Sequence, residues 1–163
     1  MRKPTHARQR THREASPLQK GCNNPDPGYS IGYNAIREWF MAKILIVDDD
    51  VQTTTLLEEV LSLYGHETTV VNMSSKAIEV ANTVNPHVFV LDLMMPEPDG
   101  FKLCRMLRAD PNFKQTPILI VTALGDTDSR IVALGAGAND YLAKPFEIDD
   151  LASRIQKLLD QAK

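Results

Sequence analysis

The chain has 163 residues, 43% hydrophobic and 24% charged, which is the composition of a soluble globular protein with room for one well-packed domain. Its apolar runs are only as long as a β-strand, which excludes a membrane-spanning helix and predicts no membrane insertion. The net charge of -3 is uneven: residues 1–40 carry 7 basic and 3 acidic residues, whereas residues 41–163 carry 11 and 18. The acidic second part argues against direct DNA binding, which needs a basic surface.

Residues 1–40 do not have the pattern of a folded domain, because basic residues are scattered through a polar stretch rich in proline and glycine. We predict a disordered extension, with a basic nucleic-acid-binding arm or an organelle-targeting peptide as alternatives. Met41 stands just before the first apolar run and is the candidate for the true start. No run is long enough for a signal peptide, and Cys22 and Cys104 are expected to be free thiols, so we expect a cytoplasmic protein.

From Met41 onward, short apolar runs alternate with segments of helical periodicity. The five strand candidates are residues 43–47, 67–71, 87–91, 117–121 and 139–143. Apolar residues recur three and four positions apart between and after them, as in helices that pack one face against a sheet. The residues that mark the five helices are Leu56, Leu57, Val60, Leu61 and Tyr64; Ala77, Ala81 and Val84; Phe101, Cys104 and Leu107; Ile131 and Leu134; and Ile148, Leu151, Ile155, Leu158 and Leu159. Five such repeats predict an α/β fold with a doubly wound parallel sheet.

Polar side chains follow four of the predicted strands at the point where each strand ends. Asp48 and Asp49 follow the first strand, Asp92 the third, Thr122 the fourth and Lys144 the fifth. In a parallel sheet of this kind, ligands bind beyond the carboxyl ends of the strands. We therefore expect these five side chains to meet at one edge of the sheet.

Three clustered carboxylates repel one another, so one of them should have a raised pKa unless a cation is present. Mg²⁺ prefers oxygen ligands and keeps several of its waters, and it would satisfy such a cluster. The alternative role for Asp48 and Asp49 is to cap the following helix, but Asp50 is already well placed for that. Asp92 can act as a nucleophile on phosphorus, and the alternative is an ordinary loop aspartate.

Lys144 and Thr122 complete the chemistry of a phosphoryl-accepting site. A lysine is a suitable point charge for phosphate oxygens, and a hydroxyl can donate to another oxygen. Taken alone, Thr122 is weak evidence, because β-branched residues are common in strands. Lys144 before Pro145 is stronger, because a lysine at the end of a buried strand has no packing role there.

The segments ILIVDDD, VLDLMMPEPDG, PILIVTA and GANDYLAKPF occur in the order and spacing of one family. From residue 42 to about residue 160, the chain resembles the receiver domain of two-component response regulators. The resemblance implies a flavodoxin-like fold of five strand–helix repeats for residues 41–163. It also implies phosphorylation of Asp92 by a histidine kinase or a histidine phosphotransfer protein.

The resemblance assigns the remaining roles. It implies that Asp49 binds Mg²⁺ directly and Asp48 mainly through water, with the main-chain carbonyl of Met94 as the third protein ligand. Thr122 and Lys144 would contact the phosphoryl group. Tyr141 matches the family's switch aromatic, which turns inward when the threonine moves. The Lys144–Pro145 peptide bond would be cis.

Two further residues bear on how long the phosphoryl group stays. The family places polar side chains two residues after the phosphorylated aspartate and two after the threonine, where they orient the hydrolytic water. Here these positions are Met94 and Leu124, which are apolar. We therefore predict slow self-dephosphorylation.

The sequence ends soon after the last predicted helix, so we expect the signal to leave through contacts with an unknown downstream protein. The resemblance also suggests a homodimer that forms on phosphorylation, through the face around the fourth helix and the fifth strand. Two alternatives stay open. One is a pseudo-receiver that binds partners without phosphorylation. The other is a haloacid-dehalogenase-type phosphatase, which would need a threonine in the segment Asp48–Gln52 and would leave Asp92 unused.

Overall fold

The computed structural model describes residues 41–162, so the extension predicted for residues 1–40 lies outside the described residues. Within this range five β-strands alternate with five α-helices, as predicted. The strands are β1 (Lys43–Val47), β2 (Glu67–Val71), β3 (Val88–Leu91), β4 (Ile118–Thr122) and β5 (Asp140–Ala143). The helices are α1 (Val51–Leu63), α2 (Ala77–Val84), α3 (Gly100–Ala109), α4 (Thr127–Gly135) and α5 (Ile148–Gln161), and a short 3-10 helix, η1 (Ser74–Lys76), precedes α2.

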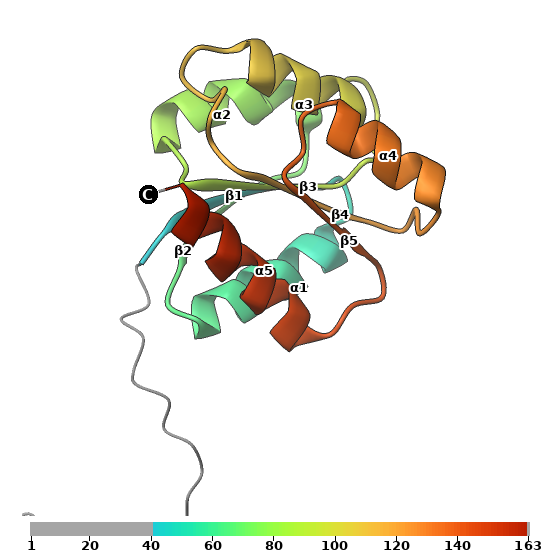
Figure 1. Ribbon diagram of the computed structural model, residues 1–163. Coiled ribbons are helices and arrows are strands. Elements are labelled where there is room, and N and C mark those ends of the chain that lie inside the picture. Colours follow the sequence, from blue (N-terminus) through green and yellow to red (C-terminus); the bar gives the residue numbers. More distant parts are fainter. Residues whose placement is uncertain (1–40, 163) are drawn as a thin grey trace, which may run out of the picture. The chain divides into compact units, whose positions relative to one another are not determined.

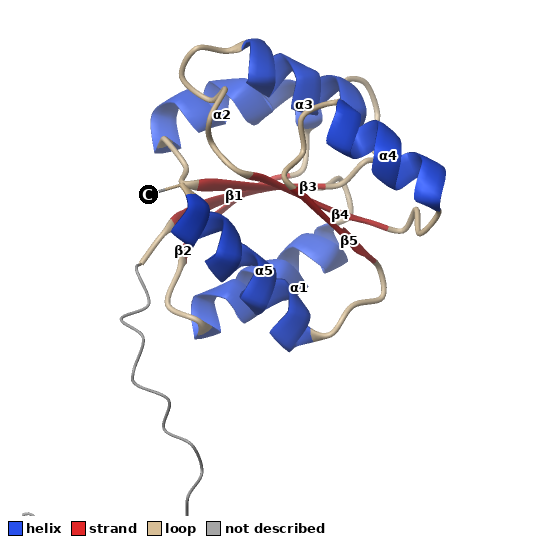
Figure 2. Ribbon diagram, viewed as in Figure 1, coloured by secondary structure: helices blue, strands red, loops and turns tan. Residues whose placement is uncertain are grey.

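The five strands form one parallel sheet in the order β2-β1-β3-β4-β5. Helices α2, α3 and α4 cover one face of the sheet, and α1 and α5 cover the other (Figures 1 and 2). Because β1 lies between β2 and β3, the chain reverses its winding direction next to β1. This arrangement confirms the doubly wound, flavodoxin-like fold and places the ends of β1 and β3 side by side.

The core has two apolar layers, one on each face of the sheet, because successive strand residues point to opposite faces. Leu45 and Phe89 belong to the layer beneath α2, α3 and α4, together with Leu107 of α3. Their neighbours Ile46 and Val90 belong to the layer beneath α1 and α5. Strands buried on both sides explain the nearly continuous apolar runs of the sequence.

The helix boundaries follow the local signals in the sequence. The Asp50 side chain accepts a hydrogen bond from the Gln52 N–H and so caps α1, as predicted. Asn85 ends α2 in a left-handed conformation with φ 51°, and Pro86 follows it. Among the helices in the described part of the chain, α5 is the longest, with 14 residues. Within residues 41–162 no helix combines the length and the apolar character needed to cross a bilayer.

Some details differ from the sequence-based expectation. Strands β3, β4 and β5 each begin one residue later than predicted, and β4 includes Thr122, which pairs with Ala143. At β4 the reason is that Pro117 has no N–H for the strand ladder. The predicted helix markers Leu56, Ile131 and Leu134 lie in helices but are exposed. Helix α4 contributes Ala133 to the core instead, its single buried residue.

Candidate functional site

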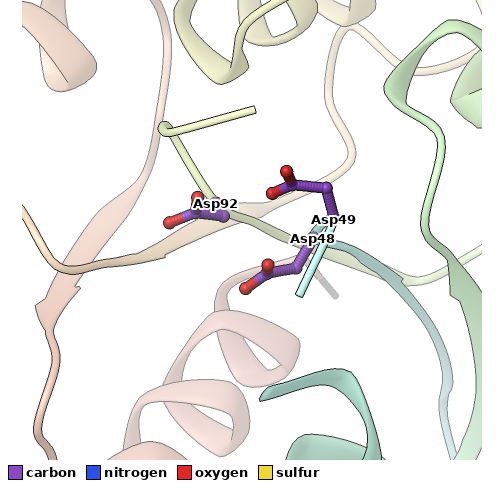
Figure 3. A group of neighbouring side chains, drawn as sticks. All are labelled: Asp48, Asp49 and Asp92. Carbon is purple, nitrogen blue, oxygen red and sulfur yellow. The ribbon is translucent and has the colours of Figure 1, made fainter. Parts of the chain in front are cut away.

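The three aspartates lie together at the carboxyl edge of the sheet. Asp48 and Asp49 directly follow β1, and Asp92 directly follows the neighbouring strand β3. Their side chains project toward the same side, and one carboxylate oxygen from each lies within 4.8 Å of the other two (Figure 3). Asp48 and Asp92 are 3% and 5% exposed, whereas Asp49 is exposed. The sequence-based placement of these acids is therefore confirmed.

Lys144 reaches the same edge from the end of β5. Its main-chain N–H donates to the Thr122 carbonyl at 2.7 Å, which fixes its position beside β4. The peptide bond to Pro145 is cis, as expected. The Lys144 Nζ donates to Asp48 Oδ2 at 2.7 Å and lies 3.6 Å from Asp92 Oδ1. One ammonium group thus faces two buried carboxylates and can balance the charge of only one of them.

Main-chain groups orient the two buried acids. Asp48 Oδ1 accepts from the Asp50 N–H at 2.9 Å, and Asp92 Oδ2 accepts from the Met94 N–H at 2.8 Å. Burial raises the pKa of Asp48, and the hydrogen bond from Lys144 opposes that shift. The Met94 side chain itself is 61% exposed. The role expected for Met94 at the metal site concerns its main chain, and the Met94 N–H does lie beside Asp92.

Asp92 carries an unsatisfied acceptor. Its Oδ1 is buried and has no hydrogen-bond partner, which is unusual because an unmet buried carboxylate oxygen costs free energy. Three carboxylates within reach of one point are a donor set that suits a hard divalent cation such as Mg²⁺. Asp49 is exposed, so the water ligands that Mg²⁺ keeps would have room on that side. The residues present therefore fit a magnesium ion.

Thr122 and Tyr141 are connected through the main chain of Leu124. The Leu124 N–H donates to Thr122 Oγ1 at 3.5 Å, and the Tyr141 hydroxyl donates to the Leu124 carbonyl. Thr122 and Tyr141 are both buried, so the structure has the tyrosine turned inward. Burial raises the pKa of Tyr141, which keeps the hydroxyl protonated as a donor.

Sequence reasoning missed the residues that shape the loops around the acids. At Gly100, a Cβ atom would lie 2.0 Å from the Asp92 carbonyl oxygen, so the start of α3 approaches the site too closely for any side chain. Asn72 and Ser74 follow β2, and their side chains bond to the two acid-bearing loops. Asn72 stands directly after a predicted strand, which is the same positional signal that identified Asp48 and Asp92.

Comparison with known proteins agrees with this geometry. The response regulator receiver domain family matches residues 44–156. The chain is 40% identical over 117 residues to the probable transcriptional regulator ycf27 of Cyanophora paradoxa, covering 72% of this chain and 48% of the relative. It is 40% identical over 121 residues to the response regulator MprA of Mycobacterium leprae, covering 74% and 52%. The chain thus spans about half the length of the curated relatives it matches.

Solved structures give the same result. The receiver domain of the Francisella response regulator 1452 has a TM-score of 0.70 and 37% identity, with 75% of this chain and 99% of that chain covered. The receiver domain of a sensor histidine kinase from Pseudomonas aeruginosa PAO1 has a TM-score of 0.69 and 31% identity, covering 74% and 99%. That structure has a magnesium ion in its active-site cleft. With the family match, these likenesses establish that the chain belongs to the response regulator receiver domain family of two-component systems.

Proposed function

We propose that this receiver domain accepts a phosphoryl group on Asp92 from a histidine kinase or histidine phosphotransfer protein, in a reaction that requires Mg²⁺. The observation that carries the proposal is the buried Asp92 Oδ1, which has no hydrogen-bond partner and lies 3.6 Å from the Lys144 ammonium. An oxygen with a free lone pair beside a cation is suited to attack phosphorus and to bear the product charge.

The residues divide the work of the transfer. A carboxylate oxygen of Asp92 bonds to phosphorus while the bond from phosphorus to the donor imidazole nitrogen breaks, and that nitrogen keeps the electron pair. Asp49, Asp92 and the Met94 carbonyl are the proposed direct Mg²⁺ ligands, with Asp48 bound mainly through water. When bound, the ion would supply charge stabilisation for the phosphoryl oxygens. Lys144 supplies a second positive charge at the same oxygens.

Thr122, Leu124 and Tyr141 are the proposed route by which phosphorylation changes the surface. The new group carries a charge of about -1.5 to -2, which would attract the Thr122 hydroxyl. Because Thr122 and Tyr141 share the Leu124 main chain, movement of the threonine would alter the tyrosine's position. The result would be a repacked face around α4 and β5 that protein partners recognise.

The side chains beside the phosphoryl site bear on how long the phosphoryl group stays on Asp92. Met94 and Leu124 carry no polar side chain to orient a hydrolytic water, so we propose that the phosphorylated protein dephosphorylates itself slowly. We propose a cytoplasmic signalling protein rather than an enzyme with repeated turnover.

The signal passes to a downstream protein, or to a second copy through the α4–β5 face. Direct DNA binding by residues 41–163 is not expected, because they carry 18 acidic and 11 basic residues.

The test is to incubate the protein with acetyl phosphate and Mg²⁺ and to measure its intact mass. The expected result is a single phosphate adduct that requires Mg²⁺ and is absent from Asp92→Asn. No adduct on the wild type would favour the pseudo-receiver. Repeated hydrolysis of phosphate esters that survives Asp92→Asn would favour the phosphatase.

A further inference from the structure

The end of β2 and the turn after it form hydrogen bonds to both the N–H and the carbonyl of Asp48. The Asp48 N–H donates to the Val71 carbonyl at 3.3 Å, and the Asn72 Nδ2 donates to the Asp48 carbonyl at 2.9 Å. Both polar groups of the Asp48 peptide segment are thereby tied to consecutive residues of β2 and its turn. A main chain held at both ends leaves the Asp48 side chain little freedom to move away from Lys144 and Asp92.

The same amide group also anchors the start of α1. The Asn72 Nδ2 donates to Thr54 Oγ1 at 3.2 Å, and the Thr54 hydroxyl donates to the Val51 carbonyl at 3.0 Å. Thr54 is buried, so this connection is shielded from water. The loop of Asp48 and Asp49 is therefore fixed both to the end of β2 and, through Asn72, to the first turn of α1.

Two residues further on, the turn holds the second acid-bearing loop. The Ser74 hydroxyl is buried and donates to the Pro96 carbonyl at 2.9 Å. Pro96 lies in the loop between β3 and α3, which begins with Asp92. Asn72 and Ser74 thus connect one short turn to both loops that carry the three carboxylates.

We propose that Asn72 and Ser74 are positioning residues that hold the two acid-bearing loops at the separation a divalent cation requires. Repulsion among Asp48, Asp49 and Asp92 pushes the loops apart, and the only ammonium contacts recorded for these acids in residues 41–162 come from Lys144. Hydrogen bonds behind the ligands of a metal site commonly contribute 10- to 100-fold in affinity. This inference rests on the proposed Mg²⁺-dependent function.

The experiment measures Mg²⁺ binding by itself. Amide resonances of the ¹⁵N-labelled protein are followed by NMR during titration with MgCl₂, without a phosphoryl donor. Asn72→Ala is compared with Asn82→Ala, a matched control whose amide also donates to a main-chain carbonyl at 2.9 Å, but within α2. Ser74→Ala is compared with Ser75→Ala, its exposed neighbour. Melting temperatures are measured for all four variants, and labelling by acetyl phosphate is measured as a function of Mg²⁺.

We expect Asn72→Ala to raise the Mg²⁺ dissociation constant about tenfold, and Ser74→Ala to raise it by a smaller factor because its bond is to the loop of Asp92 at Pro96 rather than to an acid residue itself. Both control variants should keep the wild-type dissociation constant. The Mg²⁺ concentration for half-maximal labelling should shift by the same factors. An unchanged dissociation constant in Asn72→Ala, whatever its melting temperature, would make the residue merely structural and overturn the inference.

The same measurements distinguish failure of the proposed phosphoryl transfer from failure of the positioning role. Wild-type protein that binds Mg²⁺ but is never labelled would refute phosphoryl transfer while the comparison of variants still decides the positioning role. Wild-type protein that binds no Mg²⁺ would overturn both.

Discussion

Two partly buried cations lie at opposite edges of the same sheet, and their surroundings differ. At the carboxyl edge, Lys144 lies between the charged groups of Asp48 and Asp92. At the amino edge, Arg108 of α3 donates to the carbonyl oxygens of Gly137, Phe113 and Thr116 and to Asn139 Oδ1. The Arg108 partners are neutral and every distance is 3.1 Å or less.

This difference is consistent with a structural role for Arg108 and with the role in phosphoryl transfer that we propose for Lys144. Arg108 joins the segments before β4 and β5 by hydrogen bonds to neutral acceptors. Lys144 instead faces Asp92 Oδ1, a buried oxygen without a hydrogen-bond partner. Loss of Arg108 should therefore affect stability, whereas loss of Lys144 should affect chemistry.

The largest expected effect comes from adding a side chain at Gly100, where α3 lies against the main chain of Asp92. Gly100→Ala places a methyl group 2.0 Å from the Asp92 carbonyl oxygen, so α3 must shift away from the site. We expect a loss of at least about 3 kcal/mol of unfolding free energy, measured by urea denaturation. Gly135→Ala, where the added Cβ meets nothing within 4 Å, should be neutral or slightly stabilising. Equal stability of the two variants would contradict this account of the loop.

The comparison of the two cations is tested by measuring both the unfolding free energy and the rate of labelling after each cation is replaced. Arg108→Ala should cost about 3 kcal/mol of unfolding free energy because three carbonyl oxygens in partly buried positions lose their charged donor, while the folded protein is still labelled normally. Arg105→Ala, on the exposed side of α3, is the control.

Lys144→Met should show the reverse pattern: labelling by acetyl phosphate slows by about 100-fold. The exposed Lys114→Met is its control and should keep the wild-type rate. Normal labelling in Lys144→Met would remove the distinction between the two edges.

A smaller change should come from adding polar groups near the phosphoryl site. Met94→Asn combined with Leu124→Glu should shorten the phosphoryl half-life by about tenfold, because the new side chains can orient a water for hydrolysis. Decay of the labelled protein is followed by intact mass after the donor is removed. Met106→Asn, on α3, provides the control for a methionine exchange that should leave the half-life unchanged.

The smallest effect concerns a titratable group at the amino edge. Burial lowers the pKa of His66 below its ordinary value of 6.5. The unfolded chain therefore takes up a proton near pH 6.5 that the folded protein still resists, so stability should fall as the pH drops below that value. The fall should end below the lowered folded pKa. Urea denaturation at pH 7.5 and 5.5 should show a smaller difference in His66→Phe than in the wild type, and an equal difference would refute the assignment.

Much of this architecture was predictable because its signals are local. The apolar runs, the Asp50 cap and the Asn85–Pro86 stop identify elements from neighbouring residues alone. Asp48, Asp92 and Lys144 could be brought together by one rule, that parallel strands end at a common edge. The cis bond before Pro145 was implied by the family resemblance.

The missed features depend on which elements become neighbours. Asn72 reaches the Asp48 carbonyl only because β2 pairs with β1, and Gly100 is needed only because α3 packs against the Asp92 carbonyl. The partners of Arg108 lie up to 31 residues away in the chain. The prediction from helix periodicity was wrong at Ile131, because α4 contacts the core through the small residue Ala133. Such contacts are tertiary and leave no mark in local periodicity.

The central claim is that the carboxyl edge of the sheet takes a phosphoryl group at Asp92. The most direct measurement is the intact mass of the protein after incubation with acetyl phosphate, with and without Mg²⁺, followed by peptide mapping of the modified residue. We predict one adduct, dependent on Mg²⁺, located in the peptide that contains Asp92 and lost in Asp92→Asn. An adduct that persists in Asp92→Asn, or no adduct under any Mg²⁺ concentration, would contradict the account.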